Sequence, residues 1–312
     1  MKVREFRRTD APALFALMKT EFPEEEAVLG MRAEGFSEVI RRLYRADLRV
    51  FLGLARLVGR SPFHLYVLEQ DGALAGTTLL SFARRAGFLS NVVVAPEFRR
   101  RGIARRLIET ARATAARRRK PYVVLRVLSA NTPARTLYLS AGYEVLDHQA
   151  YVVHDRPAAF APAPTPAGIR PFERRDAPAL SAIATATLPS KVRDVLPFEP
   201  RELTGISWVD RLFRAETAGW VVDRGHGPEA HVSATSTPTT EAAHLSSPIV
   251  AEGLEPALVA ELIRVAGRWL GARAPARILS SVAEYNLRGR RALEEVGFHD
   301  AFPLDTLYRP SA

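Results

Sequence analysis

The sequence predicts an α+β protein made of two copies of one domain, each a mixed, mostly antiparallel sheet flanked by helices. Its 312 residues suffice for about two domains, at roughly 150 residues per domain. Two stretches recur along the chain: VREFRRTDAPAL from Val3 matches IRPFERRDAPAL from Ile169 at eight of twelve positions, and NTPARTLYLSAGY from Asn131 is similar to NLRGRRALEEVGF from Asn286. Such self-similarity indicates a duplicated unit. Strand patterns alternate with helical apolar stripes in the first copy, and the scaffold pattern recurs in the second.

The first copy shows the elements of this domain in order. It opens with a short strand at Val3–Phe6, and Asp10, two residues before Pro12, is a good N-cap for the next helix. An amphipathic helix is expected over Gly35–Leu57, and Asp71-Gly72 between apolar runs indicates a hairpin. The other expected elements are strands at 64–68, 73–82, 88–94, 122–128, 143–145 and 150–153, and helices at 103–117 and 133–141.

The domain boundaries follow from the repeat. The first match pairs Val3 with Ile169 and the second pairs Asn131 with Asn286, which is a smaller offset, so the second copy is shorter than the first. Between the copies, residues 156–168 (RPAAFAPAPTPAG) contain four prolines, which is typical of a stiff linker. We therefore expect domains at 1–155 and 168–312, joined by a linker at 156–167.

The composition excludes several classes of protein. The chain has no cysteine, which excludes a disulfide scaffold, a thiolate metal site and a cysteine nucleophile. Its seven histidines show no metal-ligand spacing, so we expect no metal. An apolar run long enough to span a membrane and the apolar core of a signal peptide are both missing, which makes a cytoplasmic protein without membrane contact the expectation.

The positive charge of the chain is concentrated in one half. The formal net charge is +10, and residues 1–155 carry 26 basic and 16 acidic residues against 18 of each in residues 156–312. Arg99–Lys120 alone has ten basic residues and one acid, Glu109. A basic protein suggests nucleic-acid binding, but this stretch lacks interleaved aromatic residues and any recognised reader motif. An anionic partner is expected there.

The segment NVVVAPEFRRRGIARRL, from Asn91 to Leu107, predicts an anion site. A β-branched strand enters a turn bounded by Pro96 and centred on Gly102, and a helix follows at once. The first amides of a helix have no partner within it and, with the helix dipole, attract anions. Gly102 and the small Ala104 permit close approach of a ligand. A solvated basic helix start is the structural alternative.

These residues resemble the GNAT acyl-CoA N-acyltransferases. In that family a strand ending V-x-P leads into Q/R-x-x-G-x-G/A, and a second signature, N-x-x-A-x-x-L-Y-x-x-x-G-F/Y, follows. The chain has Val94-Ala95-Pro96 and then Arg99-x-x-Gly102-x-Ala104. Further along, in the same order as in the family, it has Asn131, Ala134, Leu137, Tyr138, Gly142 and Tyr143 at the second spacing. The resemblance covers residues 1–155 and implies that acetyl-CoA is the cosubstrate.

The resemblance also implies roles for individual residues. The strand Val92-Val93-Val94 would offer backbone groups to the pantetheine arm and the thioester carbonyl, although a plain buried strand fits it equally well. Asn131 would contact the pantetheine, or simply cap a helix before Pro133. Tyr138 would be the general acid that protonates the leaving thiolate, or an aromatic packed on the sheet. The pyrophosphate would be held by Arg99, Arg100, Arg101, Gly102, Ile103, Ala104 and Arg105.

Other parts of the mechanism stay open in the sequence. Many relatives carry a glutamate near the positions of Ser90 and Asn91, and neither is a carboxylate here, so ordered water is one route for deprotonation and an amine that arrives neutral is another. The acids Glu24–Glu26 lie where relatives bind the acceptor, or they complement a helix dipole. Residues 117–120 (RRRK) are expected to close a helix, with binding of the CoA 3′-phosphate as the alternative.

The second copy has lost these features. At the offset of the second match Arg99 becomes Leu254, Gly102 becomes Ala257 and Tyr138 becomes Leu293, while Val93 becomes Pro248, which has no N–H. We therefore expect a degenerate domain and an N-terminal domain that alone moves an acetyl group from acetyl-CoA to a primary amine of a small molecule or peptide. A non-catalytic acyl-CoA sensor is the main alternative, and a basic nucleic-acid-binding module is the weaker one. The oligomeric state is not readable from the sequence.

Overall fold

A computed structural model describes residues 2–21, 61–204, 215–238 and 240–312. The expected helix at Gly35–Leu57 and the acids Glu24–Glu26 lie outside these residues. The chain forms two compact units. In its described parts, unit 1 comprises residues 2–21, 61–146 and 305–312, and unit 2 comprises residues 147–204, 215–238 and 240–304.

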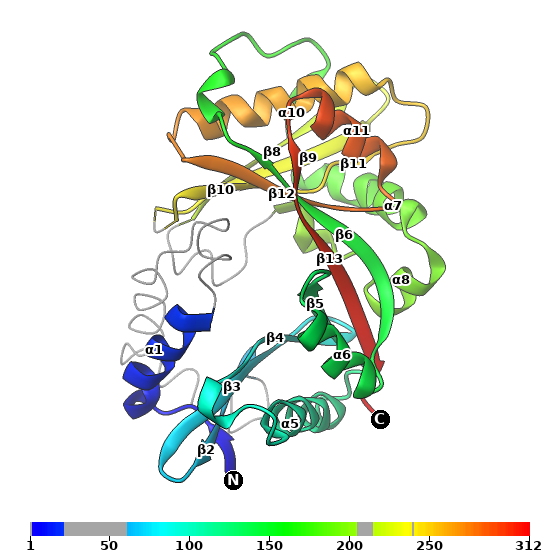
Figure 1. The fold of residues 1–312 in the computed structure, drawn as a ribbon. Helices are drawn as coiled ribbons and strands as arrows, with labels where there is room; N and C mark the ends of the chain where they lie inside the picture. Colours follow the sequence, from blue (N-terminus) through cyan, green and yellow to red (C-terminus); the bar gives the residue numbers. More distant parts are fainter. Residues whose placement is uncertain (1, 22–60, 205–214, 239) are drawn as a thin grey trace. The chain divides into compact units, whose positions relative to one another are not determined.

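Unit 1 is a mixed sheet with helices against it (Figure 1). Its strands are β1 (Lys2–Glu5), β2 (Phe63–Gln70), β3 (Ala73–Phe82), β4 (Ala86–Val94) and β5 (Tyr122–Leu128), in that order across the sheet. Its helices are α1 (Ala11–Glu21), α5 (Ile103–Arg117) and α6 (Thr132–Ser140). The β1–β2, β2–β3 and β3–β4 pairs are antiparallel, whereas β4 and β5 are parallel. This confirms the predicted α+β class.

Helix α5 forms the core of unit 1 together with the central strands. Its apolar residues recur at helical spacing, so that one face is buried while the arginines lie on the other. Leu107 and Ile108 are fully buried, and Ala111 and Ala115 continue the same stripe beneath Val123 and Leu125 of β5. The helix therefore has a fixed rotation on the sheet, which sets the direction of its first turn.

Unit 2 repeats the plan. Its strands β7 (Ile169–Pro171), β8 (Glu216–Asp223), β9 (Pro228–Ser236), β10 (Ala242–Leu245), β11 (Ile249–Val250) and β12 (Arg277–Ala283) are antiparallel except for the parallel pair β10–β12. Its helices are α7 (Ala177–Thr187), α8 (Ser190–Val195), α10 (Pro256–Gly271) and α11 (Leu287–Glu295). In both units an arginine makes a two-pronged ion pair with an aspartate six residues on, Arg4 with Asp10 and Arg170 with Asp176.

The two long closing strands, β6 (Glu144–His154) and β13 (His299–Pro310), each take part in both units. Residues 149–154 of β6 pair with β12 of unit 2. At the other end of the chain, Ser311 N–H donates to Pro121 O beside β5 of unit 1, and Leu307 is buried in the unit 1 core. The last strand of each sequence repeat thus completes the unit formed by the other. The structural units therefore do not coincide with the expected boundaries at 155 and 168, because residues 147–155 and 305–312 pack in the unit opposite to their own repeat.

The proline-rich segment at 156–167 is attached to unit 2. It contains a short 3-10 helix at Pro157–Ala159, and Phe160 packs against the unit 2 core. A Cβ on Gly267 of α10 would lie 2.6 Å from the Phe160 ring, so this glycine leaves room for the ring. The expected linker is thus an ordered segment that packs along α10, where Arg268 donates to Ala163 O and Pro164 O.

Candidate acyl-CoA site

The turn before α5 has the geometry of an anion cradle. Arg100 and Gly102 both take left-handed backbone conformations, with φ of +59° and +77°. The helical hydrogen bonds begin with Arg106 N–H donating to Gly102 O, so the amides of Ile103, Ala104 and Arg105 have no partner within the helix. A Cβ on Gly102 would meet no atom within 4 Å, so the approach to these amides is open. This arrangement suits a phosphate group.

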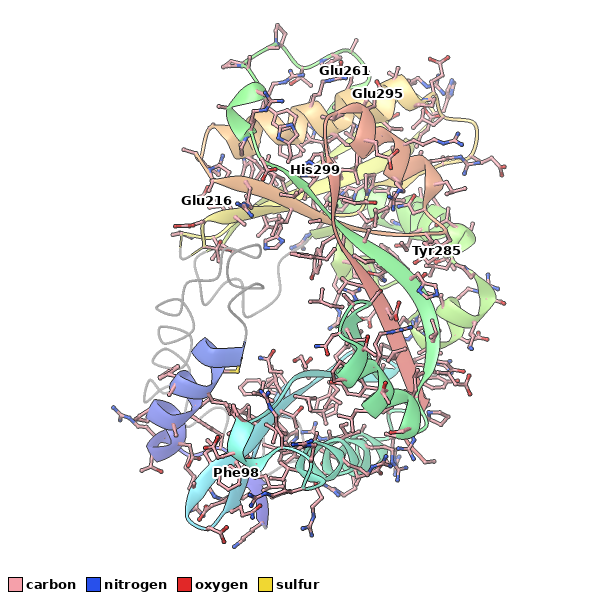
Figure 2. All side chains as sticks on the ribbon, viewed as in Figure 1. Phe98, Glu216, Glu261, Tyr285, Glu295 and His299 are labelled. Carbon is pink, nitrogen blue, oxygen red and sulfur yellow. The ribbon has the colours of Figure 1, made fainter. Side chains whose placement is uncertain are left out.

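Guanidinium groups surround the cradle. The side chains of Arg99, Arg100 and Arg101 are exposed, and Arg99 Nε donates to Val94 O over 3.2 Å. The Arg101 guanidinium lies 5.6 Å from the ring centre of Phe98, the residue labelled in this unit in Figure 2. The Ile103 side chain is instead a core residue, 1% exposed, so it contributes a backbone amide only. Positive charge and backbone amides therefore meet at this turn.

The strands β4 and β5 pair only over part of their length. Along the described strands the parallel ladder joins Ala86–Leu89 to Tyr122–Leu125 and then stops. Beyond that point the register between β3 and β4 shifts between Ser90 and Val93, and Asn91 has a φ of +52°. Such a bulge turns backbone groups out of the regular ladder. The residues predicted to face a thioester, Val92–Val94, therefore lie where β4 has left β5.

Tyr138 lies on the buried face of α6. The residue is 7% exposed and packs edge-on against Tyr143, with ring centres 5.8 Å apart. Burial raises the pKa of Tyr138 to about 12, so its hydroxyl is protonated throughout the physiological range. No hydrogen bond to this hydroxyl is found within the described part of the chain. It is a proton donor held in a weakly polar environment.

The two helices of the site are linked near the cradle. Arg105 of α5 donates to Ser140 Oγ of α6 over 3.0 Å, which brings the first turn of α5 to the last turn of α6. Asn131 is at the opposite end of α6, where its Oδ1 accepts from Ala134 N–H over 3.1 Å as an N-cap. The capping role of Asn131 is therefore present, and its exposed amide Nδ2 is still available to a ligand.

The basic run at 117–120 is at the far end of α5. With 1.5 Å rise per residue, the 15 residues of the helix separate it from the cradle by about 22 Å. Arg118 packs on Phe82, 4.8 Å from its ring centre, and donates to Ser61 O. A CoA whose pyrophosphate lies at Gly102 would carry its 3′-phosphate close to the cradle, so the geometry favours the structural role for this run.

The sequence did not predict one cluster of this unit, which Asp305 forms with Ser129 and Arg135. Asp305 of β13, 1% exposed, accepts from Ser129 Oγ over 2.9 Å and lies 2.5 Å from Arg135 Nε. Its signal in the sequence is a single acid within the mainly apolar strand AFPLDTLY. Its partners could not be found by spacing, because they belong to the other sequence repeat. Among the described residues, no three His, Asp or Glu side chains gather as a metal site, and no helix is long and apolar enough to cross a membrane.

The comparisons with known proteins agree with this geometry. Residues 16–143 match the family model of acetyltransferases of the GNAT type. The similarity covers this segment, which is less than half of the chain. The matched residues include the cradle, the point where the pairing of β4 with β5 ends, and Tyr138. The similarity indicates acyl transfer as the class of reaction. No curated protein matches the sequence.

Solved structures extend the GNAT fold to the whole chain. A tandem GNAT protein from the clavulanic acid biosynthesis pathway aligns with a TM-score of 0.61 at 15% identity, covering 100% of this chain and 98% of that one. A GCN5-related N-acetyltransferase from Sphaerobacter thermophilus aligns with a TM-score of 0.66 at 16% identity, covering 99% and 95%. At these identities the likeness is one of fold, and it confirms the tandem GNAT arrangement.

Proposed function

We propose that the protein is an N-acetyltransferase that moves an acetyl group from acetyl-CoA directly to a primary amine of a small molecule or peptide, and that unit 1 alone is active. The proposal rests on three features that occur together in unit 1. The first turn of α5 forms an open anion cradle, the neighbouring helix α6 carries a buried, protonated tyrosine, and the pairing of β4 with β5 ends part-way along the strands. Acetyl-CoA would supply the acetyl thioester.

The residues of the cradle fit the cosubstrate. Its pyrophosphate would be held by the amides of Ile103, Ala104 and Arg105 and by the guanidinium groups of Arg99–Arg101. The backbone of Val92–Val94, where β4 leaves β5, would hold the pantetheine arm and orient the thioester carbonyl. An amide N–H fixed in this direction stabilises negative charge on a carbonyl oxygen.

Proton movements are assigned to Tyr138 and water. The Tyr138 hydroxyl would donate its proton to the sulfur that leaves, because a phenol with a raised pKa keeps that proton at neutral pH. Deprotonation of the amine would proceed through ordered water, since Ser90 and Asn91 provide no carboxylate. An amine that arrives neutral needs no base before it attacks the thioester carbonyl, and the proton that its nitrogen loses as the C–N bond forms and the C–S bond breaks returns through water to the Tyr138 oxygen.

The test is a screen of acetyl-CoA consumption across primary amines, aminoglycosides and peptides. Because the protein has no cysteine, release of the CoA thiol can be read by a thiol reagent without background from the protein. With an accepted amine, Tyr138→Phe should lower kcat about 100-fold while acetyl-CoA affinity changes less than about twofold, because only the proton donor is lost.

Tyr143→Phe is the matched control. This tyrosine is also buried and packs against Tyr138, and its hydroxyl has no hydrogen-bond partner among the described residues. Removing it should leave kcat within about twofold, because no interaction is lost. A screen without any accepted amine, together with tight acetyl-CoA binding, would favour an acyl-CoA sensor. Unchanged kcat in Tyr138→Phe would remove the tyrosine from the mechanism.

A further inference from the structure

The last strand of the chain brings a buried carboxylate to the site of unit 1. Asp305 of β13 is 1% exposed, and each of its two carboxylate oxygens lies against a different residue. One accepts from the hydroxyl of Ser129, directly after β5, and the other faces Nε of Arg135 on α6. A carboxylate is taken out of water at a large cost unless it is paired in this way. Asp305 therefore fixes the spacing between the end of β5 and the first turns of α6.

The face of β13 that carries Asp305 also contacts α5, the other helix of the candidate site. Residues two apart in a strand point to the same face, so Asp305, Leu307 and Arg309 form one row. Leu307 is fully buried in the core cluster that contains Tyr138 and Tyr143. Arg309 donates to Glu109 of α5 over 2.6 Å. One row of side chains thus contacts the helix that carries the cradle and the helix that carries Tyr138.

The position of Arg135 makes the contact relevant to Tyr138. The two residues are three apart on α6, so their side chains are neighbours on the helix surface. The backbone N–H of Arg135 donates to Asn131 O, the cap residue of the same helix. Restraining the Arg135 side chain therefore restrains the rotation of α6 about its axis, and with it the direction of the Tyr138 hydroxyl.

We propose that Asp305 is a positioning residue for the acyl-transfer site, acting through Ser129 and Arg135 to align Tyr138. The inference rests on the proposed function of unit 1. It gives the second sequence repeat, which has no cradle of its own, a part in catalysis, because its closing strand carries the aligning carboxylate. Asp305 itself is buried and is not expected to touch substrate.

The test combines Asp305→Asn with Tyr138→Phe in the full-length protein. Asparagine keeps the volume and the acceptor for Ser129 but removes the charge that faces Arg135. In the wild-type background Asp305→Asn should lower kcat about tenfold with the KM for acetyl-CoA within about twofold. In the Tyr138→Phe background it should lower kcat less than twofold, because the group that Asp305 aligns is already absent.

Glu144→Gln is the matched control. Glu144 is an exposed carboxylate on β6 that accepts from the hydroxyl of Tyr308, and Tyr308 lies on β13 as Asp305 does, so Glu144→Gln removes a charge beside the same strand. It should leave kcat unchanged in both backgrounds. If Asp305→Asn does not fold, Arg135→Gln breaks the same pair from its more exposed side and is measured in the same two backgrounds.

The outcomes separate the two proposals. Equal factors in both backgrounds, or no effect in the wild-type background, overturn the positioning role alone, since general destabilisation lowers kcat regardless of Tyr138. A wild-type protein that transfers no acetyl group to any amine overturns the proposed function, and the positioning role falls with it. A loss of kcat confined to the background that contains Tyr138 supports the inference.

Discussion

The helix starts of α5 and α10 occupy equivalent places in the two units and differ in nearly every feature that binds an anion. α5 is preceded by three arginines and Gly102, whereas α10 begins at Pro256 after Glu255, and Leu254 and Val259 are buried in the core. Proline has no N–H to offer, and the carboxylates of Glu252 and Glu255 would repel phosphate. The packing of this fold is thus kept in unit 2, although the residues that form the anion cradle of unit 1 are replaced there.

The capping asparagines show the same divergence. Asn131 and Asn286 each accept from the backbone N–H three residues on, so both helices keep their N-cap. In unit 2, however, Asn286 Nδ2 also donates to Ser247 Oγ and to Pro248 O, next to β11. The group that is free for a ligand in unit 1 is thus used internally in unit 2. Leu293, fully buried at the position of Tyr138, removes the proton donor as well.

The largest expected effect tests the difference between the two helix starts. Gly102→Glu should weaken acetyl-CoA binding about 1000-fold or more, because a carboxylate would lie beside the amides that we propose as the pyrophosphate site. The stabilisation by saturating acetyl-CoA, about 3 kcal/mol at 100 times Kd, should disappear from a thermal-shift measurement.

Gly253→Glu is the matched control for this change. Gly253 precedes α10, has a φ of +80° and, like Gly102, has no atom within 4 Å of an added Cβ. Both variants carry the same backbone strain, about 1 kcal/mol, so a difference between them reports the ligand. A thermal shift that persists in Gly102→Glu would show that the cradle is not the acyl-CoA site.

The next effect tests the exchange of closing strands. Leu307→Ala should cost about 3 kcal/mol, because it empties a fully buried position in the unit 1 core. Val152→Ala, at the equivalent position of β6, should cost about 2 kcal/mol in unit 2. Amide hydrogen exchange should show lost protection in β5 and α6 for the first variant and in β12 and α10 for the second. The reverse pattern would contradict the exchange.

The exchange marks the limit of what the sequence could predict. The turn at Gly102 and the position of Tyr138 on a helix follow from local patterns, and the described strands and helices lie within a few residues of the expected bounds, except that the strands expected at 143–145 and 150–153 form one continuous strand, β6. The partner of a closing strand does not follow, because β6 and β13 are equivalent in the repeat and either unit could bury Val152 or Leu307. Asp305 was missed for the same reason, since its contacts with Ser129 and Arg135 exist only after the exchange.

The smallest expected effect concerns the stability of unit 2 in acid. His231 of β9 is 1% exposed, with its ring against Phe172 at 5.1 Å between centres. Burial lowers the pKa of His231 to about 4, opposed by the charge of Asp176 and the Leu203 backbone. The folded unit therefore keeps the ring neutral, while the unfolded chain protonates it near pH 6.5. The unfolded state binds more protons in this interval, so stability falls as the pH falls from 6.5 towards 4.

His231→Gln should remove this dependence. Between pH 6.5 and 4.5 the wild-type unit 2 should lose about 2 kcal/mol more than the variant, as read from urea unfolding at each pH with probes in β9 or α10. His226→Gln, a change at an exposed histidine of the same unit, should leave the wild-type dependence in place. Parallel pH curves for the wild type and His231→Gln would mean that the ring is not held neutral. Because His231 belongs to the unit without a cradle, acetyl-CoA binding at unit 1 should be the same in both proteins at pH 7.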